Sequence, residues 1–317
     1  MGTVVTVEVI GDEAAAPAID EGIDRALSWF HHIEASCSRF DPSSEVMRLT
    51  TRVGEAVRVS APLFEAVRFS LAMAEESGGA FDPVVGAAME RRGFDREHRT
   101  GTPIASGVAD DPSVSFRDVR LGVEHRAITL VRPVVLDLGA VAKGLAVDMA
   151  AHELRAFENF AIDAGGDLYL AGTNANGEAW RVGIRHPRAD QAIVDAVRVS
   201  NRAVCTSGDY ERIGSQGSTH ILDARTRAPS AGVVSVTTMA PTAMLADAAG
   251  TAAFALGPAD GISLLERLGV DGMMISSALE RFTTRGFPGE SATAILPDAE
   301  RSADDHPGAA GRDSGAG

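Results

Sequence analysis

An α+β fold, with mixed and largely antiparallel sheets packed against helices, is the fold class that this sequence predicts. Segments of strand and helix character follow one another without the regular strand–helix–strand alternation of a doubly wound parallel sheet. Apolar residues make up 45% of the 317 residues, aromatics make up only 5%, and glycine occurs 33 times. A core of small side chains suits closely packed helices and sheets better than a β-sandwich rich in large rings.

Helices are predicted where apolar residues recur every three or four positions. An apolar stripe from Ile19 to Phe30 predicts a helix over residues 15–38. Ser60 is a suitable N-cap for a second helix, which Gly78 and its neighbour would end. Three further helices are predicted at residues 141–157, 245–256 and 262–268.

Strands are predicted at short runs rich in β-branched and other apolar residues. Ten such runs occur, at residues 3–9, 127–131, 134–138, 160–162, 168–170, 180–184, 194–199, 233–238, 272–276 and 281–284. The segment 91–118 is polar and rich in turn residues, and we expect it to run over the surface. One folded domain is predicted over residues 1–295, followed by a disordered polar tail over residues 296–317.

The charge and the cysteines exclude several classes of function. A net charge of −15 and a pI near 4.9 argue against nucleic-acid binding and against anionic membranes, which both need clustered cations. No leader and no run of about 18 apolar residues is visible, so the sequence as written predicts a cytoplasmic protein, the alternative being export with a leader outside this sequence. Cys37 and Cys205 have no zinc-site spacing; we expect free, half-buried thiols, although one disulfide is formally possible.

The segment LDLGAVAKG at residues 136–144 carries a first candidate site. An apolar run ends at Asp137, passes through small residues and enters a helix whose N-terminal N–H groups could face an anion. Lys143 would add a mobile positive charge beside them. The alternative interpretation is an ordinary turn with a solvated lysine.

Asp247 and Thr251 form a second candidate site. They are four positions apart and share one face of the predicted helix. A carboxylate and a hydroxyl are hard oxygen donors of the kind that Mg²⁺ prefers, and the surrounding residues are small or apolar. The alternative is an exposed aspartate and a threonine bonded to its own helix.

Two more segments have weaker functional signals. His220 lies between hydroxyl residues and an apolar pair, where it could act as a base or a ligand-orienting donor, or simply bond to backbone. The run AGGD at residues 164–167 is typical of a tight turn.

Taken together, the motifs resemble those of the FAD:protein FMN transferase family, also called ApbE. The resemblance extends from Met1 to about Phe287. It rests on six segments in the family's order: SRFDPSSE at 38–45, AFDPVVG at 80–86, DLGAVAKGLAVD at 137–148, TSGDY at 206–210, HILD at 220–223 and ADAAGT at 246–251. It implies an ApbE-like (T-fold-like) architecture in the domain over residues 1–295.

The resemblance also implies roles for individual residues. The metal ligands would be the backbone carbonyl of Ala140 and the side chains of Asp247 and Thr251, and the metal would be Mg²⁺. His220 and Asp247 would act in catalysis, and Phe40 would stack on or flank the flavin ring. The FAD contacts implied by matching positions are Met1, Phe40, Ala80, Phe81, Asp82, Asp137, Lys143 and Leu222.

The implied reaction is cleavage of the FAD pyrophosphate and transfer of FMN to a threonine or serine hydroxyl of an acceptor protein, with release of AMP. One rival interpretation, an FAD pyrophosphatase in which water replaces the hydroxyl, would use the same residues. A second is a non-catalytic flavin-binding protein, which would not need the metal-binding pair. The sequence departs from the family at two places. Ala224 and Arg227 replace the proline and the glycine of a D-P-x-T-G segment, and position 250 is glycine where some relatives carry a carboxylate.

Overall fold

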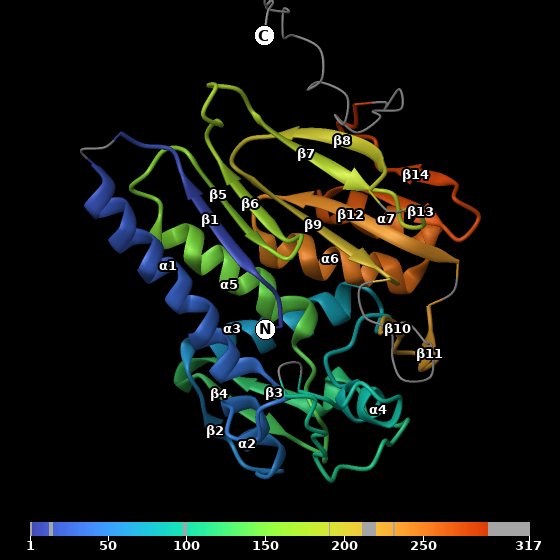
Figure 1. Cartoon of the computed structure of the whole chain (residues 1–317). Coiled ribbons are helices and arrows are strands. Elements are labelled where there is room, and N and C mark those ends of the chain that lie inside the picture. The colour runs from blue at the N-terminus through green and yellow to red at the C-terminus, as the bar shows by residue number, and fades with distance from the viewer. Residues whose placement is uncertain are drawn as a thin grey trace, which may run out of the picture.

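The computed structural model in Figure 1 describes residues 2–12, 15–97, 100–189, 191–210, 220–230 and 232–290. Met1 and the predicted tail at 296–317 lie outside the described residues, so the predicted FAD contact of Met1 and the domain boundary at residue 295 stay predictions.

The main sheet has seven strands, and every neighbouring pair in it is antiparallel. Its order is β1-β5-β6-β9-β12-β13-β14, so strands distant in sequence lie side by side. The strands are β1 (Val5–Val9), β5 (Phe160–Ala164), β6 (Leu168–Ala171), β9 (Arg202–Gly208), β12 (Val233–Ala240), β13 (Asp271–Ser276) and β14 (Arg281–Thr283). The predicted fold class is confirmed.

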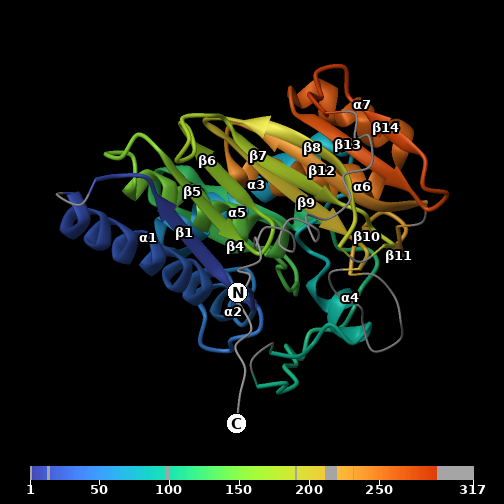
Figure 2. The same ribbon diagram turned by 45° about the horizontal axis from the view of Figure 1, so that its top comes forward.

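Both faces of this sheet are covered. Helices α5 (Gly139–Glu153) and α6 (Ala243–Leu256) pack on one face, and the hairpin of β7 (Trp180–Arg185) and β8 (Ile193–Val199) packs on the other. Figure 2 shows this hairpin lying across the sheet. Because β12 is covered from both sides, all eight of its residues are buried.

Three more helices complete the helical layer. They are α1 (Ala16–Cys37), α3 (Ala61–Glu76) and α7 (Pro258–Leu268), and the predicted cap of α3 is confirmed because the Ser60 hydroxyl accepts the N–H of Leu63. The fully buried line of α1 is shifted from the expected stripe and includes Gly22, where a β-carbon would lie 2.8 Å from the Phe157 ring. Small residues therefore bring α1 close to its neighbours.

A smaller group of elements lies below the main sheet in Figure 1. It comprises α2 (Glu45–Thr50), α4 (Gly86–Arg91) and a three-stranded sheet of order β2-β4-β3, with the short pair β10–β11 beside it. The bounds are β2 (Val57–Arg58), β3 (Val119–Gly122), β4 (Ala127–Leu130), β10 (Leu222–Asp223) and β11 (Ala228–Pro229), and two 3₁₀ turns flank β3 at Phe116–Asp118 and Val123–His125.

One predicted strand is absent from the structure, and one strand of the main sheet was not predicted. Residues 134–138 form no strand: the segment is buried and extended, but Val135 makes a single parallel bridge with Val85, and the N–H of Asp137 bonds to the Pro83 carbonyl. The neighbouring segment is a loop, which does not provide the repeated backbone hydrogen bonds of a paired strand. The apolar β-branched residues here therefore fill the core without joining a sheet. In contrast, β9 was missed, because its second half reads T-S-G and resembles a turn.

Helices α5 and α6 touch at backbone level. A β-carbon built on Gly144 would lie 2.5 Å from the carbonyl oxygen of Ala243, closer than non-bonded atoms come. The carboxylate of Asp148, one turn further along α5, accepts the N–H groups of Ala243 at 2.7 Å and Met244 at 2.9 Å. Asp148 therefore caps the N-terminus of α6 from another helix.

We expect Gly144→Ala to lower the free energy of unfolding by about 2–3 kcal/mol, because the added methyl forces two helix backbones apart. Gly250→Ala in α6 is the matched control: its β-carbon would lie 3.3 Å from the Thr238 hydroxyl and no closer to any backbone atom. We expect a change of less than about 1 kcal/mol there, since helix propensity favours alanine. Urea unfolding of both variants measures the difference, and equal losses would contradict the close-approach argument.

Candidate active site

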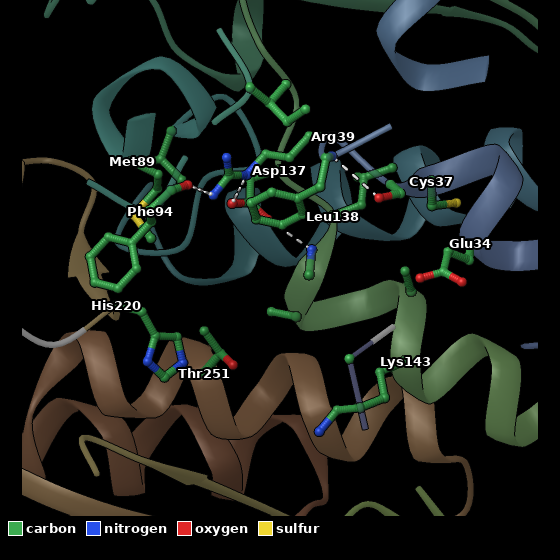
Figure 3. Close-up of a pocket in the computed structure, with 18 of the residues that line it drawn as sticks. Glu34, Cys37, Arg39, Met89, Phe94, Asp137, Leu138, Lys143, His220 and Thr251 are labelled. Atoms are coloured by element: carbon green, nitrogen blue, oxygen red, sulfur yellow. Dashed lines mark hydrogen bonds and ion pairs between the residues drawn. The ribbon is translucent and has the colours of Figure 1, made fainter. Parts of the chain in front are cut away.

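A single cavity of about 1420 Å³ collects most of the predicted site residues. It lies between the smaller group of elements and the helical layer, and Figure 3 shows Arg39, Asp137 and Phe94 on one side of it and His220, Thr251 and Lys143 on the other. The predicted residues that line it are Phe40, Phe81, Asp82, Asp137, Ala140, Lys143, His220, Leu222, Asp247 and Thr251. Ala80 is fully buried and does not line the cavity; its carbonyl accepts the N–H of Ala224, next to β10.

Asp247 and Thr251 form an oxygen-rich end of this cavity. Both lie on α6, one turn apart, and Asp247 is only 6% exposed, so the interpretation as a solvent-facing aspartate is wrong. The hydroxyls of Thr251 and Ser207 lie 3.4 Å apart and bring β9 to the same place. Ala140, at the start of α5, lines this cavity as well.

Lys143 is fixed at the cavity wall rather than mobile. Its ammonium lies 2.8 Å from a carboxylate oxygen of Asp167, and Asp167 is fully buried whereas Lys143 is 18% exposed. Asp167 ends the turn between β5 and β6, in which Gly165 and Gly166 have φ angles of +65° and +94° that favour glycine. The AGGD run is thus a tight turn, as predicted, and it also delivers a buried carboxylate to the site.

Arg39 joins three parts of the opposite wall. Its guanidinium is 4% exposed and donates to Asp137 at 2.7 Å and to the Phe94 carbonyl at 2.7 Å. It also lies over the Phe40 ring, 4.1 Å from the ring centre. The second oxygen of Asp137 accepts the N–H of Gly139 at the entry to α5. Two predicted FAD contacts, Phe40 and Asp137, are therefore held by one buried arginine.

Two other predicted site residues, Asp82 and His220, differ in what their side chains do. The carboxylate of Asp82 accepts the N–H groups of Val84 at 2.8 Å and Phe116 at 2.9 Å, and burial raises its pKa. Asp82 therefore organises the chain beneath the cavity. The His220 ring meets the Phe94 ring edge-on, with centres 6.4 Å apart, so Phe94 gives the imidazole a defined orientation.

Both cysteines are free and more deeply buried than expected. Burial raises the pKa of Cys37 to about 12, so the thiol that lines the cavity is not a nucleophile at neutral pH. Burial also raises the pKa of Cys205, with further contributions from Asp167 and Asp247. Several buried charged groups thus lie around the oxygen-rich end of the cavity.

The donors at this end fit Mg²⁺ better than a transition metal. In the described ranges no three His, Cys, Asp or Glu side chains are grouped to hold a metal ion. Asp247, Thr251 and Ala140 offer a carboxylate, a hydroxyl and a carbonyl, which are all hard oxygen donors. Mg²⁺ commonly keeps several waters and binds through one or two carboxylates plus substrate phosphates, so these donors are compatible with it.

The carboxyl of Asp148 has a raised pKa that links the stability of the protein to pH. Burial raises this pKa to about 6, although the two N–H groups at the start of α6 favour the carboxylate form. A carboxyl whose pKa is higher in the folded state binds more protons folded than unfolded between about pH 4 and pH 6. Its contribution to stability is therefore largest below pH 4, falls as the pH rises through 6, and is flat above.

We expect the stability difference between the parent protein and Asp148→Asn to be about 1 kcal/mol larger at pH 5.0 than at pH 7.5. Asparagine cannot titrate, so the difference isolates this carboxyl. Urea midpoints of both proteins at the two pH values measure it. A difference that grows with pH would reverse the sign and show that the helix N-terminus, not burial, dominates.

The sequence did not reveal the roles of four residues. Arg39 and Phe94 line the cavity, and Asp148 and Asp167 contact the helices whose residues line it. Arg39 lies inside the segment SRFDPSSE, and Asp148 ends the segment DLGAVAKGLAVD, so the motifs contained both without revealing their partners. Asp167 carried a weak signal as an acid after paired glycines. Phe94 carried none, because it lies in the polar segment expected to run over the surface.

These features define a class: α+β proteins with a helix-backed antiparallel sheet and one deep cavity that joins an aromatic wall to an oxygen-rich end. The ApbE family matches residues 1–274, and the chain therefore belongs to the ApbE family. The resemblance noted in the sequence is confirmed. The family and the names of the relatives also confirm the expectation of a transferase enzyme.

Relatives named FAD:protein FMN transferase occur in several bacteria. The chain is 29% identical to that of Vibrio cholerae over 291 residues, covering 87% of this chain and 85% of the relative. It is 31% identical to that of Treponema pallidum over 301 residues, covering 87% and 82%.

Solved structures agree with these relatives. The flavin transferase ApbE from Vibrio cholerae matches with a TM-score of 0.76 at 25% identity, covering 90% of this chain and 95% of that one. The ApbE protein of Thermotoga maritima matches with a TM-score of 0.73 at 29% identity, covering 89% and 93%. Among the helices that the structure describes, none has both the length and the hydrophobicity needed to cross a bilayer.

Proposed function

We propose that the protein is a Mg²⁺-dependent FAD:protein FMN transferase, which moves FMN from FAD to a threonine or serine hydroxyl of an acceptor protein. One observation carries the proposal: a single cavity brings the aromatic Phe40 together with Asp247, Thr251, Lys143 and His220. A ring system and a pyrophosphate in one ligand match these two kinds of surface. The names of the relatives give the same activity.

The side chains of Asp247 and Thr251 and the carbonyl of Ala140 would hold the metal ion. Mg²⁺ bound there would offset the charge that develops on the pyrophosphate oxygens as the bridge breaks. Lys143 would contact the same phosphates, because its ammonium lies in the same cavity wall and is held there by Asp167. Phe40, backed by Arg39, would lie against the flavin.

The transfer balances without a redox step. The acceptor hydroxyl oxygen attacks the FMN phosphorus, a new phosphoester bond forms, the P–O bond of the pyrophosphate bridge breaks, and AMP leaves. His220, oriented by the edge of Phe94, would take the hydroxyl proton. The cavity, of about 1420 Å³, is larger than the roughly 300–1000 Å³ typical of small-ligand sites, which is consistent with an acceptor loop entering beside FAD.

The test is to incubate the protein with FAD, Mg²⁺ and a threonine-containing acceptor peptide, and to measure peptide mass and AMP together. We expect a mass gain equal to FMN less water and one AMP per modified peptide. Release of AMP and free FMN, equal with and without peptide, would instead identify an FAD pyrophosphatase. Binding of FAD with no AMP over hours would identify a non-catalytic flavin-binding protein.

A further inference from the structure

Asp167 is an unusual carboxylate for the interior of a protein. It is fully buried, and within the described part of the chain neither of its oxygens has a partner of hydrogen-bond geometry. Its Oδ2 lies 2.8 Å from the ammonium of Lys143. A buried carboxylate with so little hydrogen bonding is costly, so its retention calls for a reason beyond folding.

Lys143 is unusual in a second, independent way. The chain contains 28 arginines and a single lysine, and that lysine is Lys143. Everywhere else a side-chain cation is needed, arginine supplies it. A compact ammonium differs from a guanidinium in that it concentrates its charge at one point and can make several contacts at once. One site in the molecule thus uses the compact cation, and this site is the cavity wall.

We propose that Asp167 is a positioning residue that acts through Lys143: it holds the ammonium at the cavity wall, where the positive charge faces an anionic phosphate of the ligand. The inference rests on the proposed function, because FAD supplies that phosphate. An ammonium on a flexible four-carbon stem loses rotamer freedom when it binds an anion. The ion pair with Asp167 restricts the stem beforehand, which favours phosphate binding.

The neighbouring carboxylate of Asp163 separates this role from a merely structural one. Asp163 lies in the same turn and accepts the N–H of Gly166 at 2.8 Å, so it stabilises the turn directly. Its interaction stays within the turn, whereas Asp167 reaches to α5. If Asp167 only stabilised the β5–β6 turn, Asp163→Asn and Asp167→Asn would have similar consequences.

The experiment measures two properties of Asp167→Asn, with Asp163→Asn as the matched control. The first is the rate at which an amine-selective acylating reagent modifies Lys143 at fixed pH, quantified by peptide mass spectrometry. Because Lys143 is the sole lysine, the N-terminus is the only other amine. The second is FAD affinity in EDTA, from quenching of flavin fluorescence, measured also in a Lys143→Gln background.

We expect Asp167→Asn to raise the labelling rate of Lys143 about fivefold or more and to weaken FAD binding about tenfold. The affinity loss should vanish in the Lys143→Gln background, and Asp163→Asn should cause neither change. An affinity loss that persists without Lys143, or an equal effect of Asp163→Asn, would overturn the inference. If the parent protein fails to bind FAD both in EDTA and with Mg²⁺, the proposed function itself is wrong, while the labelling ratio still reports whether Asp167 restrains Lys143.

Discussion

Asp247→Ala should reduce FMN transfer by about 1000-fold or more while leaving the fold intact. The variant removes the carboxylate among the three donors proposed for the metal, and carbonyl and hydroxyl oxygens alone bind Mg²⁺ weakly. Alanine suits its position on α6, where buried alanines surround it, so the melting temperature should not fall. AMP release from FAD across a Mg²⁺ titration measures the loss.

Thr251 provides the control for this prediction. Thr251→Ser keeps the hydroxyl and should retain most activity, whereas Thr251→Val keeps the shape, removes the oxygen and should raise the Mg²⁺ concentration needed for half-maximal rate. Normal transfer by a folded Asp247→Ala protein would remove the metal assignment. Loss of activity in Thr251→Ser equal to that in Thr251→Val would show that packing, not an oxygen donor, matters at this position.

Arg39→Met should lower the free energy of unfolding by about 2–3 kcal/mol and raise the KM for FAD. The guanidinium is almost fully buried and donates to Asp137, which would be left without this cation. The Phe94 carbonyl would lose its donor, and the Phe40 ring would lose the cation that lies against it. Since Phe40 and Asp137 line the cavity, both the stability and the ligand affinity should respond.

Arg68→Met is the matched control for Arg39→Met. Arg68 also pairs with a carboxylate, that of Glu65, but on the exposed surface of α3. Exposed pairs contribute little, so we expect a loss below about 1 kcal/mol and an unchanged KM. Urea unfolding and steady-state kinetics compare the two variants. Equal stability losses would show that the buried ion pair has no special weight.

The sequence predicted the elements whose signals are local. Helix α3 begins at Ala61 with Ser60 as its N-cap, as expected, since capping depends on residues a few positions apart. The prediction failed where the answer lay in a distant partner: residues 134–138 have strand character but face a loop, and β9 has turn character but is completed by β6 and β12. Register and pairing depend on tertiary contacts that no local pattern contains.

The candidate site shows the same division. Asp247 and Thr251 could be paired from their four-residue spacing on one helix. The link between Lys143 and Asp167 could not, because it crosses from a helix to a turn between two strands, and the link between Arg39 and Asp137 spans 98 positions. The motifs contain residues that line the cavity, but only the fold shows which charged side chains face one another.

The contact of Gly144 with the Ala243 backbone limits which walls of the cavity can move. Helices that touch without intervening side chains, and that are also joined by the Asp148 cap, should move as one rigid block. Ala140 and Asp247 belong to the two halves of this block, so their separation should be nearly constant, and amide protons at the start of α6 should exchange slowly. Any widening of the cavity to admit a bulky acceptor must then come from the opposite side, where Phe94 and its neighbours lie on a loop.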